Sequence, residues 1–313
     1  ALVGFGVDGA PVYCRDLNAH GPMAVLLKDA IKPNLVQTIE GTPAIIHGGP
    51  FANIAHGTSS LIAARMGLHL ADYYVTEAGF GADLGAEKFF DIFCRKSELP
   101  VAGVVIVATI KALKYHGGVK KKNLGAEDVV AVERGFVNLK RHIDNIIGFG
   151  WKPVVCLNVH GNDTEAEKKI LVELCNTYGV ECVPTEAHAS GSDGALELAK
   201  AVLSGIQEKM PNYAYPLDIP LQEKMEMLAK KVYGAGEVTY TPKARKYMAR
   251  WEDMGFRELP LSVAKTQYSF SDNKRLLGAP EDFEIHIREV KLSAGAGFVI
   301  PIAGEIMRMP GLP

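Results

Sequence analysis

Cysteine is scarce in this 313-residue sequence, and none of its five cysteines belongs to a C-x-x-C pair. An odd number of isolated cysteines disfavours both a disulfide framework and a zinc site. The sequence also lacks any apolar run near the ~20 residues that a membrane-spanning helix needs, and no basic N-terminal stretch precedes an apolar one. These absences predict reduced thiols, no membrane association and a cytoplasmic location.

Neither sign of charge is in excess, because 34 Lys and Arg balance 36 Asp and Glu, for a formal net charge of −2. This balance gives no general attraction to nucleic acid or to anionic lipid. The basic run Lys120-Lys121-Lys122 has no aromatic residue interleaved with it, which favours a solvated turn over a nucleic-acid patch. We therefore expect no nucleic-acid partner.

Several motifs that carry chemistry are absent as well. The sequence contains no G-x-x-x-x-G-K-[ST], so it has no P-loop with which to cradle a triphosphate. It contains neither G-x-S-x-G nor H-E-x-x-H, which are typical of serine and zinc hydrolases. Glycine, in contrast, is plentiful, with 32 residues. We expect functional loops where glycines cluster beside apolar runs.

Apolar runs alternate with segments of helical periodicity, and this pattern predicts an α/β fold with a parallel sheet and covering helices. We expect three units: residues 1–148 with that sheet, a second α/β lobe at 149–210, and a small α+β domain at 211–313 that opens with a linker at 211–220. The predicted strands are 1–7, 11–14, 43–46, 72–76, 103–108, 153–158, 181–184, 261–265 and 283–291. The predicted helices are 22–30, 53–66, 86–96, 129–147, 163–178, 195–206, 221–233 and 242–254.

A first glycine-rich loop follows the predicted strand at 43–46. Ligands in parallel α/β sheets bind beyond the carboxyl ends of strands, and Gly48 and Gly49 would let a ligand approach the backbone. His47 and His56 flank this loop. Two interpretations stay open, a ligand-binding loop and a tight turn with two hydrogen-bonded histidines.

A second glycine cluster follows the predicted strand at 72–76. Gly79 and Gly81 form a G-x-G pattern without the further glycine of the dinucleotide fingerprint. Glu77 or Asp83 is placed to accept a hydrogen bond from a hydroxyl or an amine. A bulged turn without a ligand is the alternative interpretation.

A third element follows the predicted strand at 103–108 and contains Lys111, Lys114 and His116. Its cations near a sheet edge would suit a phosphate group. Surface lysines are common, however, and the pattern favours that interpretation.

Seven blocks of the sequence point to a family: KDAIKPNLVQ at 28–37, HGGPFANIAHG at 47–57, EAGFGADLGAEK at 77–88, VATIKALKYHGG at 107–118, AKTQYSFSD at 264–272, REVKLSAGAG at 288–297 and MPGLP at 309–313. Together they resemble formate–tetrahydrofolate ligase, also called 10-formyltetrahydrofolate synthetase. The resemblance covers essentially the whole chain. It implies that the first unit is part of a P-loop NTPase-like domain.

The resemblance implies an ATP-dependent ligation in two steps. Formate attacks the γ-phosphate of ATP to give formyl phosphate, and N10 of tetrahydrofolate then takes the formyl group. Mg²⁺ and a monovalent cation are the metals implied, and no residue is assigned to hold them. The expected catalytic residues are His47, Asn53, His56 and Lys111. The expected nucleotide-binding residues are Gly48, Gly49, Ala52, Glu77, Gly79, Gly81 and Asp83.

The family stacks the pterin ring between a Phe and a Trp, and this sequence differs at both positions. The matching residues are His160, in NVHGND at 158–163, and His188, in TEAHASG at 185–191. With Gly161 and Pro184 they form the predicted folate pocket, beyond the carboxyl ends of the predicted strands at 153–158 and 181–184. Imidazoles stack with less area, so we expect weaker pterin binding than an aromatic pair would give.

The P-loop of the family lies in an N-terminal segment with no counterpart in this sequence. We therefore expect that the chain alone neither hydrolyses ATP nor forms formyl phosphate. Ligation would need a P-loop segment from a companion chain or from a longer natural chain, and a homo-oligomer is expected. The alternative is a catalytically silent binding or assembly subunit.

Overall fold

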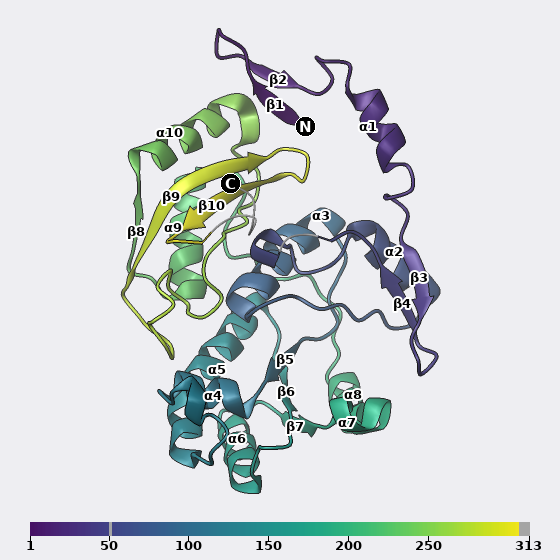
Figure 1. Ribbon diagram of the computed structural model, residues 1–313, viewed down its shortest axis with the longest axis vertical. Coiled ribbons are helices and arrows are strands. Elements are labelled where there is room, and N and C mark those ends of the chain that lie inside the picture. The colour runs from purple at the N-terminus through teal and green to yellow at the C-terminus, as the bar shows by residue number, and fades with distance from the viewer. Residues whose placement is uncertain (50–51, 307–313) are drawn as a thin grey trace.

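A computed structural model describes residues 1–49 and 52–306 (Figure 1). The lower half of the view holds one sheet with its helices, and the upper left holds a second sheet with α9 and α10. An N-terminal arm with β1, β2, α1, β3 and β4 runs over the top and down the right side. Among the described residues, no helix is long and apolar enough to cross a membrane.

Three parallel strands in the order β5-β6-β7 form the lower sheet, which confirms the predicted α/β class. Val155 and Leu157 of the central strand are fully buried, as expected for a strand covered on both faces. The strands of this sheet are β5 (Val105–Ala108), β6 (Val154–Asn158) and β7 (Cys182–Thr185). Its helices are α4 (Ile110–His116), α5 (Val129–Phe149), α6 (Glu165–Thr177), α7 (Ala187–Ser190) and α8 (Leu196–Ser204), and short 3₁₀ turns are η4 (Lys121–Asn123) and η5 (Gly191–Ala195).

Local signals in the sequence fix the ends of these helices. Asp128 caps α5 by accepting from the Ala131 N–H, and Thr164 and Glu167 cap α6 reciprocally. Glycine sets the spacing between α4 and α5, because a Cβ at Gly135 would lie 1.9 Å from the Leu113 carbonyl oxygen. The two helices therefore pack backbone against backbone.

The second sheet has the order β10-β9-β8, with β9 antiparallel to β10 and parallel to β8. The prediction of a strand at 261–265 was wrong, because that segment makes only isolated bridges from Leu261 and Ala264 to β10. The prediction of a linker at 211–220 was also wrong, since Ala214 and Tyr215 are buried in the core of this part. The elements are α9 (Leu221–Leu228), η6 (Ala229–Tyr233), β8 (Glu237–Tyr240), α10 (Pro242–Trp251), η7 (Glu252–Phe256), β9 (Glu284–Ser293) and β10 (Phe298–Ala303).

The N-terminal arm consists of two antiparallel hairpins and two helices. Its elements are β1 (Leu2–Phe5), β2 (Pro11–Tyr13), α1 (His20–Leu27), β3 (Asn34–Gln37), β4 (Pro43–Ile46), η1 (Ala52–Ile54) and α2 (Leu61–Leu70). The strand predicted at 43–46 exists, but it pairs with β3 and does not join the parallel sheet. The helix predicted at 53–66 begins only at Leu61.

The strand predicted at 72–76 is absent, and this prediction was wrong. A strand needs a neighbour for its N–H and C=O groups, and no strand of the described residues pairs with this segment. Tyr73 and Val75 consequently stay 61% and 89% exposed.

The next segment is helical, as predicted, but most of its turns are wide. It runs through η2 (Ala82–Ala86) and η3 (Phe89–Cys94) into α3 (Arg95–Ser97), and η2 and η3 are π-helical. Such turns are rare and often occur at functional sites. The three-unit division stays a prediction, and β5 and β6 pair across its first boundary.

Candidate functional site

The first two glycine-rich loops meet each other, although no parallel strand precedes either of them. Gly57, at φ +81°, approaches so closely that an added Cβ would lie 2.7 Å from the Gly85 carbonyl oxygen. The Thr58 and Thr76 hydroxyls are 2.9 Å apart and share a hydrogen bond. Only glycine fits Gly85 itself, where a Cβ would stand 1.8 Å from the Gly79 carbonyl oxygen.

Asp83 is buried at the centre of this loop pair. One of its oxygens lies 2.7 Å from Lys265 Nζ, and the other lies 4.0 Å from His142 Nδ1. Burial by itself would raise the pKa of Asp83, but attraction to Lys265 and then to His142 brings the pKa below its ordinary value. The carboxylate is therefore ionised at neutral pH, and Lys265 and His142 hold it in place.

Lys265 also fixes the segment that follows it. Its ammonium donates to the Thr266 and Ser269 carbonyl oxygens, at 3.2 and 2.6 Å. His142 packs at 4.6 Å against Phe270 of the same segment, and burial lowers the pKa of His142. Sequence reasoning did not select Lys265 or His142, and the only signal for Lys265 was its place in the block at 264–272.

A row of buried charged side chains continues from Asp83 along η2, η3 and α3. Burial and the nearby Asp91 raise the pKa of Glu87 well above its usual range, and neither Glu87 oxygen has a hydrogen-bond partner among the described residues. Burial lowers the pKa of Lys88 to about 8 and raises that of Asp91 to about 6. Asp91 is paired with Arg95 at 2.9 Å, so this row couples the loop to the core.

The two histidines of the first loop have structural contacts. His47 bridges Ser60 Oγ at 2.6 Å and the Ala30 carbonyl oxygen at 3.1 Å. His56 packs edge-on against Phe93, and burial, followed by repulsion from Lys96, lowers its pKa. For His47, these contacts match the interpretation of a turn with hydrogen-bonded histidines. Catalytic roles for His47 and His56 stay predictions.

The remaining predicted residues of these loops differ in their surroundings. A Cβ at Gly49 or Gly79 would meet nothing within 4 Å, so both backbones face open space. Gly81 is tight, because a Cβ there would lie 2.6 Å from Asp83 Oδ1. Glu77 is exposed, and Gly48 has a left-handed φ of +61°. Ala52 and Asn53 lie in the short 3₁₀ helix η1. Lys111 is half-buried in the first turn of α4, beyond the end of β5.

The predicted folate-pocket residues follow two neighbouring strands, as expected. Asn158 at the end of β6 pairs with Thr185 at the end of β7, so His160 and His188 follow the same edge of the sheet. His160 is half-buried, and its backbone N–H donates to Asp163 Oδ2 at 2.8 Å. His188, Gly161 and Pro184 are exposed. Their role in binding folate stays a prediction.

Metal ligands were not assigned from the sequence. In the described ranges 1–49 and 52–306, no group of three or more His, Cys, Asp or Glu side chains could hold an ion. The MPGLP block at 309–313 lies outside the described residues.

Comparison with known proteins gives two findings. A family model described as formate–tetrahydrofolate ligase matches residues 1–313. A curated protein of Nocardioides sp. (strain ATCC BAA-499 / JS614), named formate–tetrahydrofolate ligase, is 55% identical over 316 residues. That match covers 100% of this chain and 56% of the relative, so the chain spans little more than half of the relative's length.

Proposed function

Because the chain belongs to the formate–tetrahydrofolate ligase family, we propose that it takes part in the ATP-dependent ligation of formate to tetrahydrofolate. The observation that carries this proposal is the match of the family to the whole chain, including the loop built around Asp83. In the proposed reaction a formate oxygen attacks the γ-phosphorus and ADP leaves. N10 of tetrahydrofolate then attacks the formyl carbon, and inorganic phosphate leaves.

The part of this chain in that reaction is binding and orientation. The Gly79 backbone faces open space, where a nucleotide has room to approach, while Gly85, Asp83 and Lys265 hold the loop in one shape. Positioning and charge neutralisation carry most of the catalysis in phosphoryl transfer. His160 and His188, beyond the β6 and β7 strand ends, would flank the pterin ring.

We further propose that a P-loop segment, from a companion chain or from a longer natural chain, completes the site. Large apolar side chains are exposed along the N-terminal arm and the segment at 72–76, including Val25, Leu26, Ile39, Leu70 and Val75. Exposed apolar side chains along this arm support an interface there, and no strand of the described residues pairs with the segment at 72–76, which has the composition of a strand. Packing against the P-loop segment would cover both features.

Mg²⁺ and a monovalent cation are assigned to no residue of this chain. A hard cation needs several oxygen ligands, and the described residues offer no cluster of three or more acidic or histidine side chains. No step of the proposal passes through a metal held here.

Gly79→Val tests the nucleotide loop. An added Cβ at Gly79 meets nothing within 4 Å in the folded chain, so folding should be unchanged, while the branched side chain blocks the approach of a ligand. Titration calorimetry with ADP should show binding to the chain that weakens at least tenfold in the variant. Gly4→Val, at another open glycine, should leave ADP binding intact. Equal ADP affinity in Gly79→Val and the parent chain would show that the loop is only structural.

A further inference from the structure

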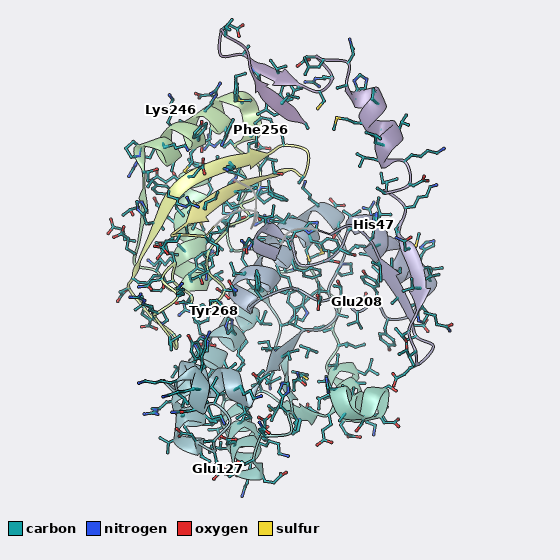
Figure 2. The ribbon with its side chains drawn as sticks, in the orientation of Figure 1. His47, Glu127, Glu208, Lys246, Phe256 and Tyr268 are labelled. Carbon is teal, nitrogen blue, oxygen red and sulfur yellow. The ribbon has the colours of Figure 1, made fainter. Side chains whose placement is uncertain are left out.

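The lining of a surface depression of about 430 Å³ includes no residue of either glycine-rich loop. Two stretches distant in sequence form it, the region from α4 to η4 and the segment before β9. Its lining residues are Tyr115, Lys121, Tyr268, Lys274, Arg275 and Leu277. Figure 2 shows Tyr268 where the chain before β9 approaches α4 and α5.

All charges in this lining are positive. Lys121, Lys274 and Arg275 supply three cations, no carboxylate lines the depression, and none of the three forms an ion pair with a described acidic residue. A second depression of about 310 Å³ differs in this respect, because Glu281 and Asp282 accompany its Arg141 and Lys230. The first depression therefore lacks a counter-charge of its own.

Lys121 connects the two sides of the depression. Its Nζ lies 5.6 Å from the ring centre of Tyr115 and 5.6 Å from that of Tyr268. The sequence predicted a solvated turn here because no aromatic residue is interleaved with Lys120-Lys121-Lys122. The fold supplies the aromatic neighbours that the local sequence lacks.

Hydrogen bonds make the wall before β9 rigid. The Gly278 N–H donates to His116 Nδ1 at 3.1 Å, and Asn138 Nδ2 donates to the Gly278 carbonyl oxygen at 2.8 Å. Ser269 Oγ donates to the Leu276 carbonyl oxygen at 2.6 Å. The backbone that carries Lys274 and Arg275 is thus in place before any ligand arrives, which reduces the entropic cost of binding.

We propose that this depression binds a multivalent anion, a small molecule with at least two phosphate or carboxylate groups. The guanidinium and the two ammonium groups would pair with the anionic groups, and the tyrosine rings would flank the body of the ligand. The site shares no lining residue with the predicted nucleotide and folate sites, although Tyr268 lies on the segment that Lys265 joins to Asp83. It does not depend on the proposed function.

Titration calorimetry with inorganic tripolyphosphate and with tricarballylate tests the proposal. We expect saturable 1:1 binding of at least one probe, and the probe that binds identifies phosphate or carboxylate as the preferred group. Lys274→Gln with Arg275→Gln should weaken that binding at least tenfold, as should Lys121→Gln.

Lys122→Gln is the matched control, because it removes the same charge from the neighbouring, exposed residue that does not line the depression. It should change the affinity less than twofold. Circular dichroism should show that all variants fold, since the substituted side chains are exposed. The proposal is overturned if neither probe saturates, or if Lys122→Gln weakens binding as much as the lining variants do.

Discussion

Asp83 illustrates how single residues hold the candidate site together. Its carboxylate is almost completely buried and lies 2.7 Å from an equally buried ammonium. Moving both charges out of water is costly, and the pair is maintained because Lys265 and Asp83 compensate each other. The carbonyl oxygens of Thr266 and Ser269 satisfy the remaining Lys265 protons. The pair therefore joins the glycine loop to a segment more than 180 residues away in sequence.

Replacing Lys265 by Met leaves the Asp83 charge buried without its ammonium partner, with His142 Nδ1 at 4.0 Å. We expect the free energy of unfolding to fall by about 3–5 kcal/mol, measured by urea denaturation at pH 7. Adding Asp83→Asn should recover much of the loss. Lys243→Met is the control, because the exposed Lys243 pairs with Glu289 at 2.9 Å on the surface, where solvent screens the pair, so its loss should cost far less than that of Lys265. Equal losses in the two Lys→Met variants would contradict this account.

His116 predicts a pH dependence of stability. Burial, followed by repulsion from His142, lowers the pKa of His116 to about 4, from an unfolded value of 6.5. The unfolded chain therefore binds more protons between these values, and the contribution of His116 to stability is lost as the pH falls from 6.5 to 4. Protonation of Nδ1 would also remove the acceptor for the Gly278 N–H.

His116→Asn keeps an acceptor near that position and does not titrate. Urea denaturation between pH 7 and pH 4 should show a smaller loss of stability in this variant than in the parent chain. An identical pH dependence in both would show that His116 does not report on this contact.

At this scale the sequence predicted residue types better than residue roles. It selected Asp83, Gly79 and Gly81 from a local pattern of glycine beside an acid. It did not select Lys265 or His142, because their meeting with Asp83 depends on the tertiary fold. Nor did it show that Gly85 is the tightest glycine of the loop, since only the structure reveals which backbone approaches it.

Among the elements, α4 and α5 show how small residues control packing. A Cβ added at Gly135 would lie only 1.9 Å from the Leu113 carbonyl oxygen. A Cβ added at Gly148, in the same helix, would meet nothing within 4 Å. Gly135→Ala must push the helices apart and should lower the free energy of unfolding by about 1–3 kcal/mol. Gly148→Ala should raise it by roughly 0.5–1 kcal/mol, because alanine favours the helix.

Both values come from urea denaturation of the two single variants. Because the substitutions are chemically identical and share α5, the difference between them isolates the contact with α4. The packing argument fails if Gly135→Ala is as stable as Gly148→Ala.

Elements with complete local signals were predicted well. The strands β5, β6 and β7 are apolar runs that pair with each other, and α5 and α6 carry caps and an apolar stripe. The segment at 72–76 has strand composition, but no strand of the described residues pairs with it, and Tyr73 and Val75 stay exposed. The segment at 211–220 is rich in proline, which suggested a linker, yet Tyr215 is buried in the core, where its hydroxyl oxygen accepts a hydrogen bond from the Leu261 N–H.

The described residues form two large apolar cores, a smaller cluster of Ile92, Ala264, Phe298, Ile300 and Ile302, and an arm that is poorly covered. One core lies between the parallel sheet and its helices, and the other joins β8–β10 to α9, α10 and the segment with Phe90 and Phe93. In the arm, α1 has no buried residue. This contrast agrees with the proposal that the arm packs against a P-loop segment, from a companion chain or from a longer natural chain, and that the site is complete only with that segment.

Formate-dependent formation of ADP tests this central claim most directly. The chain is mixed with the separately produced part of the Nocardioides ligase outside the matched 316 residues, where the family resemblance places the P-loop. With formate, ATP and tetrahydrofolate present, we predict that neither polypeptide alone forms ADP, whereas the mixture forms ADP and 10-formyltetrahydrofolate in equal amounts. A stable complex without ADP formation, or formate-dependent ADP formation by this chain alone, would contradict the account.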